Sequence, residues 1–141
     1  MNKDVYITIR GATKKDEESF DQVVTKVRGS YHYRDGVHYI SYEEPEENTD
    51  TVIKNLIKLT AISMEHTKKG TLKTCLSFEE DKLHETSYMT PFGELKLAVK
   101  TVSYEFKEEE DNLKAELTYH LFLNDESSGL RSISINIDSL G

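Results

Sequence analysis

Apolar side chains recur at every second position along most of the chain, which is the spacing of strands that bury one face. The alternation is clearest in residues 5–9, 72–78, 115–123 and 133–137. Turn-forming residues separate these sets at short intervals, and no segment has the convincing periodicity of an amphipathic helix. About ten strand candidates follow one another in this way, which predicts an all-β domain folded as an antiparallel barrel.

The strongest local signal is Asp35-Gly36, a dipeptide that tolerates the positive φ angles of a two-residue hairpin turn. A turn of this length pairs Arg34 with Val37 and Tyr31 with Ile40. One face of the predicted hairpin then carries Tyr31, Tyr33, His38, Ile40, Tyr42 and Glu44.

Several positions predict interruptions of the regular strands. Gly29 allows a bend or a close approach of two backbones. A change of apolar phase at residues 100–101 predicts a bulge, and residues 91–93 form a break because proline donates no ladder bond. We expect a turn at residues 127–129, and either one helical turn or a loop at residues 13–19.

Length and charge restrict the partners. With 141 residues, the chain has the size of one domain, taken here as residues 1–141. Twenty-six acidic and 18 basic residues give a formal net charge of -8, which repels nucleic acid and anionic membrane surfaces. We therefore expect neither as a partner. The chain lacks a membrane-length apolar run and a signal-peptide pattern, so we expect a cytoplasmic protein.

Sequence spacing gives no sign of a metal or catalytic centre. The lone Cys75 excludes an internal disulfide and is interpreted as an ordinary strand residue. His32 and His38 lie close in the predicted hairpin but on opposite faces, and no other histidine has a ligand-like spacing. Glu43 and Glu44 likewise face opposite ways, so they cannot flank one substrate atom. We expect no metal and no cofactor.

Glu44 is the residue that says most about function. Alternation along the strand places its carboxylate on the same face as Ile40 and Tyr42, which is the apolar face of the hairpin. Either the strand ends there and the side chain turns to water, or Glu44 is a polar anchor at the entrance of a ligand cavity. The barrel interior is correspondingly either filled by side chains or hollow. The predicted ligand-binding residues are Tyr31, Tyr33, Tyr42 and Glu44, with Tyr88 and Thr90 at the barrel mouth.

Three segments, residues 29–33, 39–44 and 88–95, resemble in their order and spacing the YwiB-like family of uncharacterised bacterial proteins. The resemblance spans nearly the whole chain. It implies a calycin-like, or lipocalin-like, β-barrel in a bacterial cytoplasm. The family has no established reaction, so the resemblance supplies no catalytic residue.

The leading functional hypothesis is a non-enzymatic module that binds a small, partly apolar molecule in its barrel. The alternative is a solid barrel that contacts another protein, including a second copy of itself as a homodimer. An enzyme ranks third, because no nucleophile or phosphate-loop motif is present.

Overall fold

The computed structural model describes residues 2–14 and 20–140 and confirms an all-β fold of ten strands. The strands are β1 (Asn2–Lys14), β2 (Phe20–Arg34), β3 (Val37–Pro45), β4 (Val52–Leu59), β5 (Ser63–Lys69), β6 (Lys73–Glu79), β7 (Leu83–Thr90), β8 (Gly93–Glu109), β9 (Asn112–Leu123) and β10 (Glu126–Ser139).

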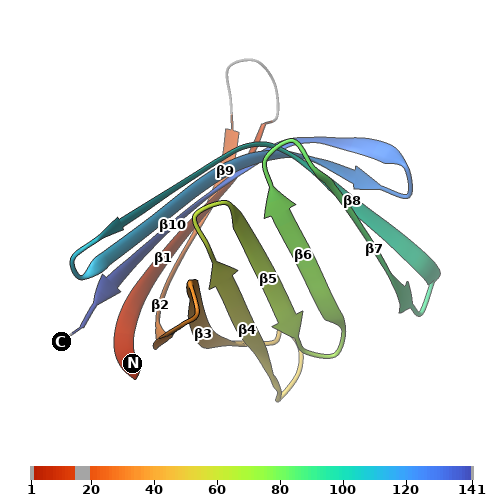
Figure 1. The fold of residues 1–141 in the computed structure, drawn as a ribbon. Coiled ribbons are helices and arrows are strands. Elements are labelled where there is room, and N and C mark those ends of the chain that lie inside the picture. The colour runs from red at the N-terminus through yellow and green to blue at the C-terminus, as the bar shows by residue number, and fades with distance from the viewer. Residues whose placement is uncertain (1, 15–19, 141) are drawn as a thin grey trace.

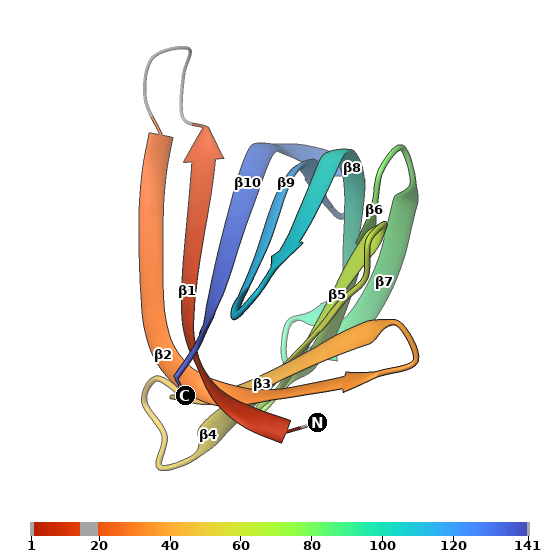
Figure 2. The same cartoon turned by 60° about the vertical axis from the view of Figure 1, so that its left-hand side comes forward.

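All ten strands form one antiparallel sheet in the order β6-β5-β4-β3-β2-β1-β10-β9-β8-β7. The sheet curls into a nearly closed barrel, in which β6 comes close to β7 and β8 (Figures 1 and 2). Side chains and turns close the gap: the Tyr104 hydroxyl of β8 donates to the Thr60 carbonyl at 2.8 Å, and the Asp81 amide donates to the Thr101 carbonyl at 2.9 Å.

The Asp35-Gly36 turn is confirmed, with φ angles of 50° and 83° and the predicted pairs from Arg34–Val37 to Tyr31–Ile40. The Gly29 backbone packs closely against the next strand: a Cβ there would meet the Ser41 carbonyl oxygen and lie 2.7 Å from Cδ1 of Ile7. This close approach explains the glycine. It lies immediately before Ser30, where β2, still paired with β1, also begins to pair with β3.

The predicted bulge is confirmed between Thr101 and Ser103, where the register of β8 against β9 shifts. The extra residue, Val102, points outward and is 46% exposed. The phase change therefore keeps the apolar residues on both sides of the bulge on the inner face.

The expected turn at residues 127–129 is wrong. The chain turns at Asn124-Asp125, whose φ angles of 49° and 69° are those of a tight hairpin, and residues 127–129 form a bulge inside β10. Asparagine and aspartate adopt positive φ more readily than most residues, which explains the position of the turn. Thr13 belongs to β1, and residues 15–19 of the proposed helical turn or loop lie outside the described residues.

Inward-facing side chains from nine strands make one core. Its buried apolar members are Val5, Ile7, Tyr31, Ile40, Tyr42, Ile57, Leu59, Met64, Phe78, Val99, Leu113, Ala115, Leu117, Tyr119, Ile135 and Ile137. Other apolar residues pack against this core but are only half-buried; they are Ile9, Val27, Leu76, Tyr104, Phe106, Leu121 and Ile133. The interior therefore consists of a fully buried apolar core and, around it, apolar side chains that are only partly covered by the rest of the protein.

Candidate functional site: a polar row inside the barrel

The first four predicted site residues lie on the inner face of the β2–β3 hairpin, but their burial differs. Tyr31 and Tyr42 are 9% and 6% exposed and belong to the core. Glu44 is half-buried near the end of β3, whereas Tyr33, close to the turn, is 44% exposed. On this face of β3 the chain thus passes from the buried Tyr42 to the half-buried Glu44.

The two remaining predicted residues lie on β7, which is one end of the sheet, whereas β3 lies within it between β4 and β2. The Thr90 hydroxyl donates to the Gly93 carbonyl at 2.8 Å and accepts from the Phe92 amide at 3.1 Å, so it stabilises its own turn. The side chain of Tyr88 lies outside the part of the chain that the structure describes. The structure does not bring Thr90 to the hairpin tyrosines.

Glu44 instead meets side chains from β4 and β5, which sequence reasoning did not select. Asn55 is 2% exposed, and its Nδ2 donates to Oε1 of Glu44 at 3.2 Å. Its Oδ1 lies 2.8 Å from Nε2 of His66. The ammonium of Lys68 lies 3.4 Å from the same Glu44 oxygen. These four residues, here called the polar row, cross three neighbouring strands on the inner face.

The hydrogen bonds of the polar row determine the tautomer of His66. The carboxylate of Glu44 only accepts, so the Asn55 amide presents its NH₂ group to Glu44 and its oxygen to His66. Nε2 of His66 must therefore carry the proton. Nδ1 keeps its lone pair, since among the described residues the ring forms its hydrogen bond through Nε2, and the residue as a whole is half-buried.

The environment keeps His66 neutral. Burial, with a smaller contribution from the charge of Lys68, lowers the pKa of His66 to about 4, and Glu44 opposes this shift. Burial also raises the pKa of the Tyr42 phenol, with the Glu44 charge acting in the same direction. At neutral pH the site thus presents a carboxylate, a neutral imidazole and a protonated phenol, which together can accept and donate hydrogen bonds.

The register of the strands explains why the sequence did not reveal this site. Asn55 pairs with Tyr42 on one side and with Lys68 on the other, and His66 is opposite Ile57. None of these relationships is visible as a motif. One signal was available: Asn55 interrupts the alternating apolar set between Ile53 and Ile57, which marks a buried amide that needs partners.

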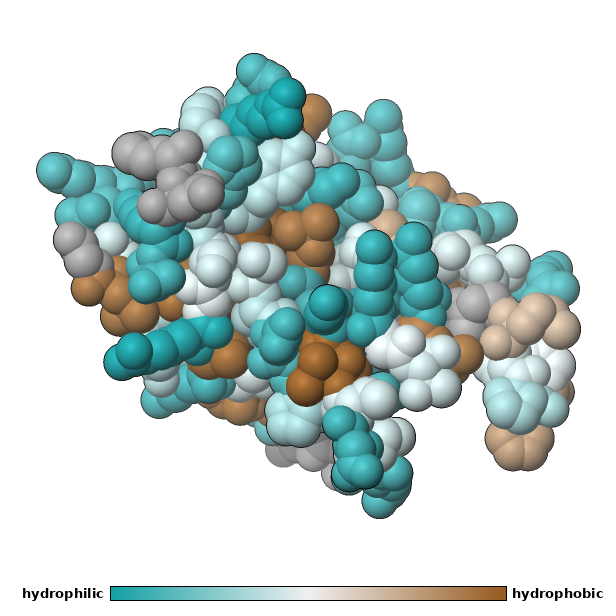
Figure 3. Space-filling model, turned by 90° about the horizontal axis from the view of Figure 1, so that it is seen from below, coloured by the Kyte–Doolittle hydropathy of each residue, from teal (hydrophilic) through white to brown (hydrophobic). Residues whose placement is uncertain are grey.

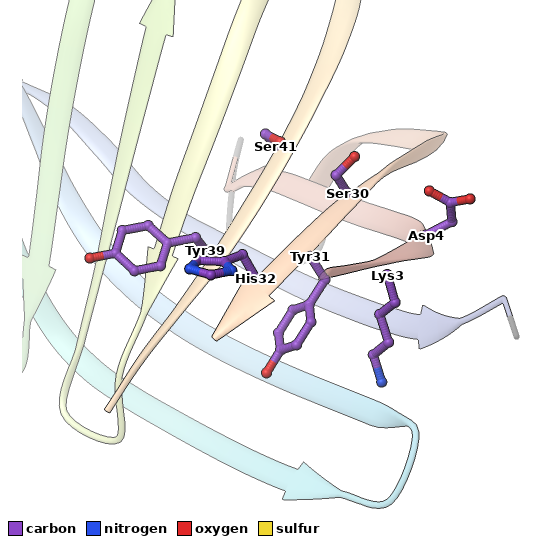
Figure 4. Close-up of a pocket in the computed structure, with 7 residues that line it drawn as sticks. All are labelled: Lys3, Asp4, Ser30, Tyr31, His32, Tyr39 and Ser41. Carbon is purple, nitrogen blue, oxygen red and sulfur yellow. The ribbon is translucent and has the colours of Figure 1, made fainter. Parts of the chain in front are cut away.

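A separate hollow of about 590 Å³ lies where β1, β2 and β3 meet. It is lined by Lys3, Asp4, Ser30, Tyr31, His32, Tyr39 and Ser41. Figure 4 shows that Tyr31 and Lys3 extend to one side of the sheet, while Asp4 and Ser30 extend to the other. The hollow therefore follows the rim of the barrel and is distinct from the polar row.

Within the described residues, no group of three or more His, Cys, Asp or Glu side chains is arranged to hold a metal ion. Cys75 is half-buried on β6, between the Thr67 hydroxyl and an oxygen of Glu65, each 3.4 Å from its sulfur. None of the described segments forms a helix with the length and apolarity required for a membrane span.

Fold and site together define a class: a ten-stranded antiparallel barrel with a polar row on its inner face. The chain belongs to the family described as domain of unknown function (DUF1934), whose model matches residues 7–135. The structure is similar to that of the ywiB protein from Bacillus subtilis, with a TM-score of 0.81, 17% identity and coverage of 99% of this chain and 94% of that one. None of the curated proteins compared with the sequence matches it.

Proposed function

We propose that this protein is a non-enzymatic binding module that holds a small, partly apolar molecule against the inner face of its barrel. The observation that carries the proposal is the polar row, in which the buried amide of Asn55 orients both Glu44 and His66. An oriented carboxylate and the acceptor nitrogen of a half-buried imidazole fit a ligand that donates hydrogen bonds, such as a hydroxyl or an amide N–H.

The surroundings of the row supply the apolar half of such a site. Val27 and Leu76 face inward from neighbouring strands and are only half-buried, so part of their apolar surface is available to a ligand. A few oriented polar groups within a mainly apolar lining are typical of small-molecule sites. A structural role alone would require only that the buried groups satisfy one another.

Native mass spectrometry of protein purified without denaturation tests this function. We expect a bound small molecule that is lost on unfolding, and we expect Glu44→Gln and His66→Leu variants to retain less of it. Glu43→Gln, which changes the neighbouring exposed carboxylate, is the matched control. Protein that carries no small molecule, and whose melting temperature no added metabolite mixture raises, would contradict the proposal.

A specific observation favours a second function, self-association through the β7–β8 hairpin. Phe92 at its turn is 100% exposed, and Met89 and Leu83 on β7 are 68% and 53% exposed. β7 is also an end of the sheet, so its outer edge has no neighbouring strand in the ladder. Exposed apolar side chains beside an open edge fit a homodimer.

The face of the molecule seen from below supports ligand binding as the first choice. Seen from below, hydrophilic side chains cover most of the face, and hydrophobic residues appear in separate patches (Figure 3). Light scattering separates the two functions: a dimer at micromolar concentration that Phe92→Ser converts to a monomer would support self-association. A monomer at all concentrations would remove it.

A further inference from the structure

A second inward-facing row crosses the other wall of the barrel, on β1, β10, β9 and β8. Thr13 is in register with Arg131, Arg131 with Tyr119, and Tyr119 with Thr101. Arg131 lies four residues before the buried Ile135 on the same strand, so the two side chains point to the same face of the sheet. An arginine therefore faces the interior of this wall.

The guanidinium of Arg131 is poorly satisfied. Nη1 donates to the Thr13 hydroxyl and Nη2 to the Ser128 hydroxyl, each at 3.3 Å, and both partners are neutral. Nε is buried and has no hydrogen-bond partner. Among the described residues, no carboxylate forms an ion pair with Arg131. A half-buried cation with an orphaned donor is costly unless an anion completes its environment.

The neighbours of Arg131 add further donors and an apolar lining. Tyr119 is 8% exposed, packs its ring 4.9 Å from that of Phe78, and has a pKa raised by burial, so its phenol keeps its proton. Thr101 is fully buried, and its hydroxyl also has no partner in the described residues. The half-buried Ile9, Leu121 and Ile133 belong to the same wall.

We propose that Arg131, with Tyr119 beside it, forms a binding subsite for the carboxylate of a small apolar acid. The planar guanidinium matches a carboxylate with two parallel hydrogen bonds, and the phenol supplies another donor. The apolar residues of the wall receive the body of the molecule. The inference rests on the proposed function, since it requires an interior that admits a ligand, and it adds the chemical class of that ligand.

Decanoate, decanol and decylammonium are suitable probes, because they share one apolar chain and differ only in the head group. Thermal melts and calorimetry should show binding of decanoate in preference to the other two. Arg131→Gln and Arg131→Lys should each weaken decanoate binding at least about tenfold, the loss expected for a charge-assisted hydrogen bond, and Tyr119→Phe should weaken it less. Arg10→Gln, on the exposed face of β1, is the control and should have no effect.

Two outcomes overturn the subsite in different ways. If decanol binds as well as decanoate, or Arg131→Gln leaves decanoate affinity unchanged, the interior binds ligands without an acid site and only this inference fails. If none of the three probes binds, the acid site fails, and native mass spectrometry decides separately on the proposed function.

A separate test asks whether the chain supplies its own anion. Asp21 is opposite Thr13 in register, so its carboxylate is the one to test. If Asp21→Asn and Arg131→Gln lower the melting temperature equally and not additively, Asp21 is the anion for Arg131 and the inference is wrong.

Discussion

The phenol oxygen of Tyr31 lies 2.6 Å from Nδ1 of His38, joining two buried residues of adjacent strands in the core. Burial raises the pKa of the Tyr31 phenol, so the phenol remains protonated and donates this bond. Nε2 of His38 lies 3.2 Å from a carboxylate oxygen of Glu108, which connects the β2–β3 hairpin to β8. The contact thus links the hairpin to the opposite wall of the barrel.

Tyr31→Phe should destabilise the fold by about 1–3 kcal/mol, because it leaves Nδ1 of His38 buried without its donor. Urea titration measures the change. Tyr33→Phe is the matched control: Tyr33 also packs on His38, with ring centroids 4.8 Å apart, but it is 44% exposed, and we expect a change below about 0.5 kcal/mol. Equal effects of the two variants would show that the buried hydrogen bond contributes little.

The lowered pKa of His66 predicts that the protein loses stability in mild acid. Its folded pKa of about 4 lies below the ordinary value of 6.5, so between these pH values the unfolded chain binds a proton that the folded chain does not. The free energy of unfolding is therefore highest above pH 6.5 and falls as the pH decreases toward 4. From pH 7 to pH 5 we expect this residue to contribute a loss of about 2 kcal/mol.

Urea titrations of His66→Gln across this range measure the contribution, because the variant should show a flatter pH dependence than the parent protein. His120→Gln, which alters an exposed histidine on β9, is the control and should leave the slope unchanged. A parent and a His66→Gln variant with the same slope would contradict the buried, neutral imidazole.

Gly29→Ala should destabilise the barrel by about 1–3 kcal/mol or more, because the added Cβ meets the Ser41 backbone carbonyl and Cδ1 of Ile7. Backbone atoms cannot move aside as a flexible side chain can. Gly11→Ala on β1 is the matched control, since a Cβ there has no atom within 4 Å, and we expect it to be neutral or stabilising. Thermal melts compare the two; similar melting temperatures would mean that β2 and β3 are less closely packed at Gly29.

Turns and bulges could be predicted where neighbouring residues alone determine the backbone conformation. The Asp35-Gly36 turn and the bulge near Thr101 could be predicted because short-range chemistry and parity determine them. The final turn was misplaced because Asn124-Asp125 contains no glycine, whereas the bulged residues 127–129 do. Serine and glycine favour a bulge and a turn alike, so composition alone did not separate them.

The candidate site was only partly accessible to the same reasoning. Hairpin parity placed Tyr42 and Glu44 on the inner face, but the partners of Glu44 depend on the register of β4 and β5. That register is set by the connections on either side of β4 and by core packing. The sequence therefore marked Asn55 as an interruption of an apolar set but gave no sign that it meets Glu44 and His66. Thr90 was expected at the barrel mouth, and its position relative to the hairpin depends on how the sheet curls, which no local sequence pattern determines.

Gly36→Val should cost on the order of 1 kcal/mol or more, because φ at this position is +83°, a conformation that a β-branched residue adopts only with strain. The predicted effect is on the hairpin that carries Tyr42 and Glu44. Denaturant titration provides the measurement. Unchanged stability would indicate that the turn rearranges freely and would weaken every cross-strand pair derived from it.

Glu44→Gln distinguishes a structural carboxylate from a binding one. Glutamine keeps the size of the side chain and an oxygen that can accept from Nδ2 of Asn55, while the ion pair with Lys68 is lost. The Lys68 and Glu44 side chains are 45% and 29% exposed, so this pair contributes less than about 1 kcal/mol. The free variant should therefore unfold almost as the parent does.

The ligand-bound states should differ, because a hydrogen-bonded carboxylate binds a donor group more strongly than a neutral amide does. With the molecule retained through purification added at 100 times its Kd, the parent should gain about 2.7 kcal/mol of stability, and Glu44→Gln much less. Glu43→Gln, on the outer face, should gain as much as the parent. An equal gain in all three proteins would show that the carboxylate of Glu44 does not anchor the ligand. A large loss of stability in free Glu44→Gln would instead assign Glu44 to the fold.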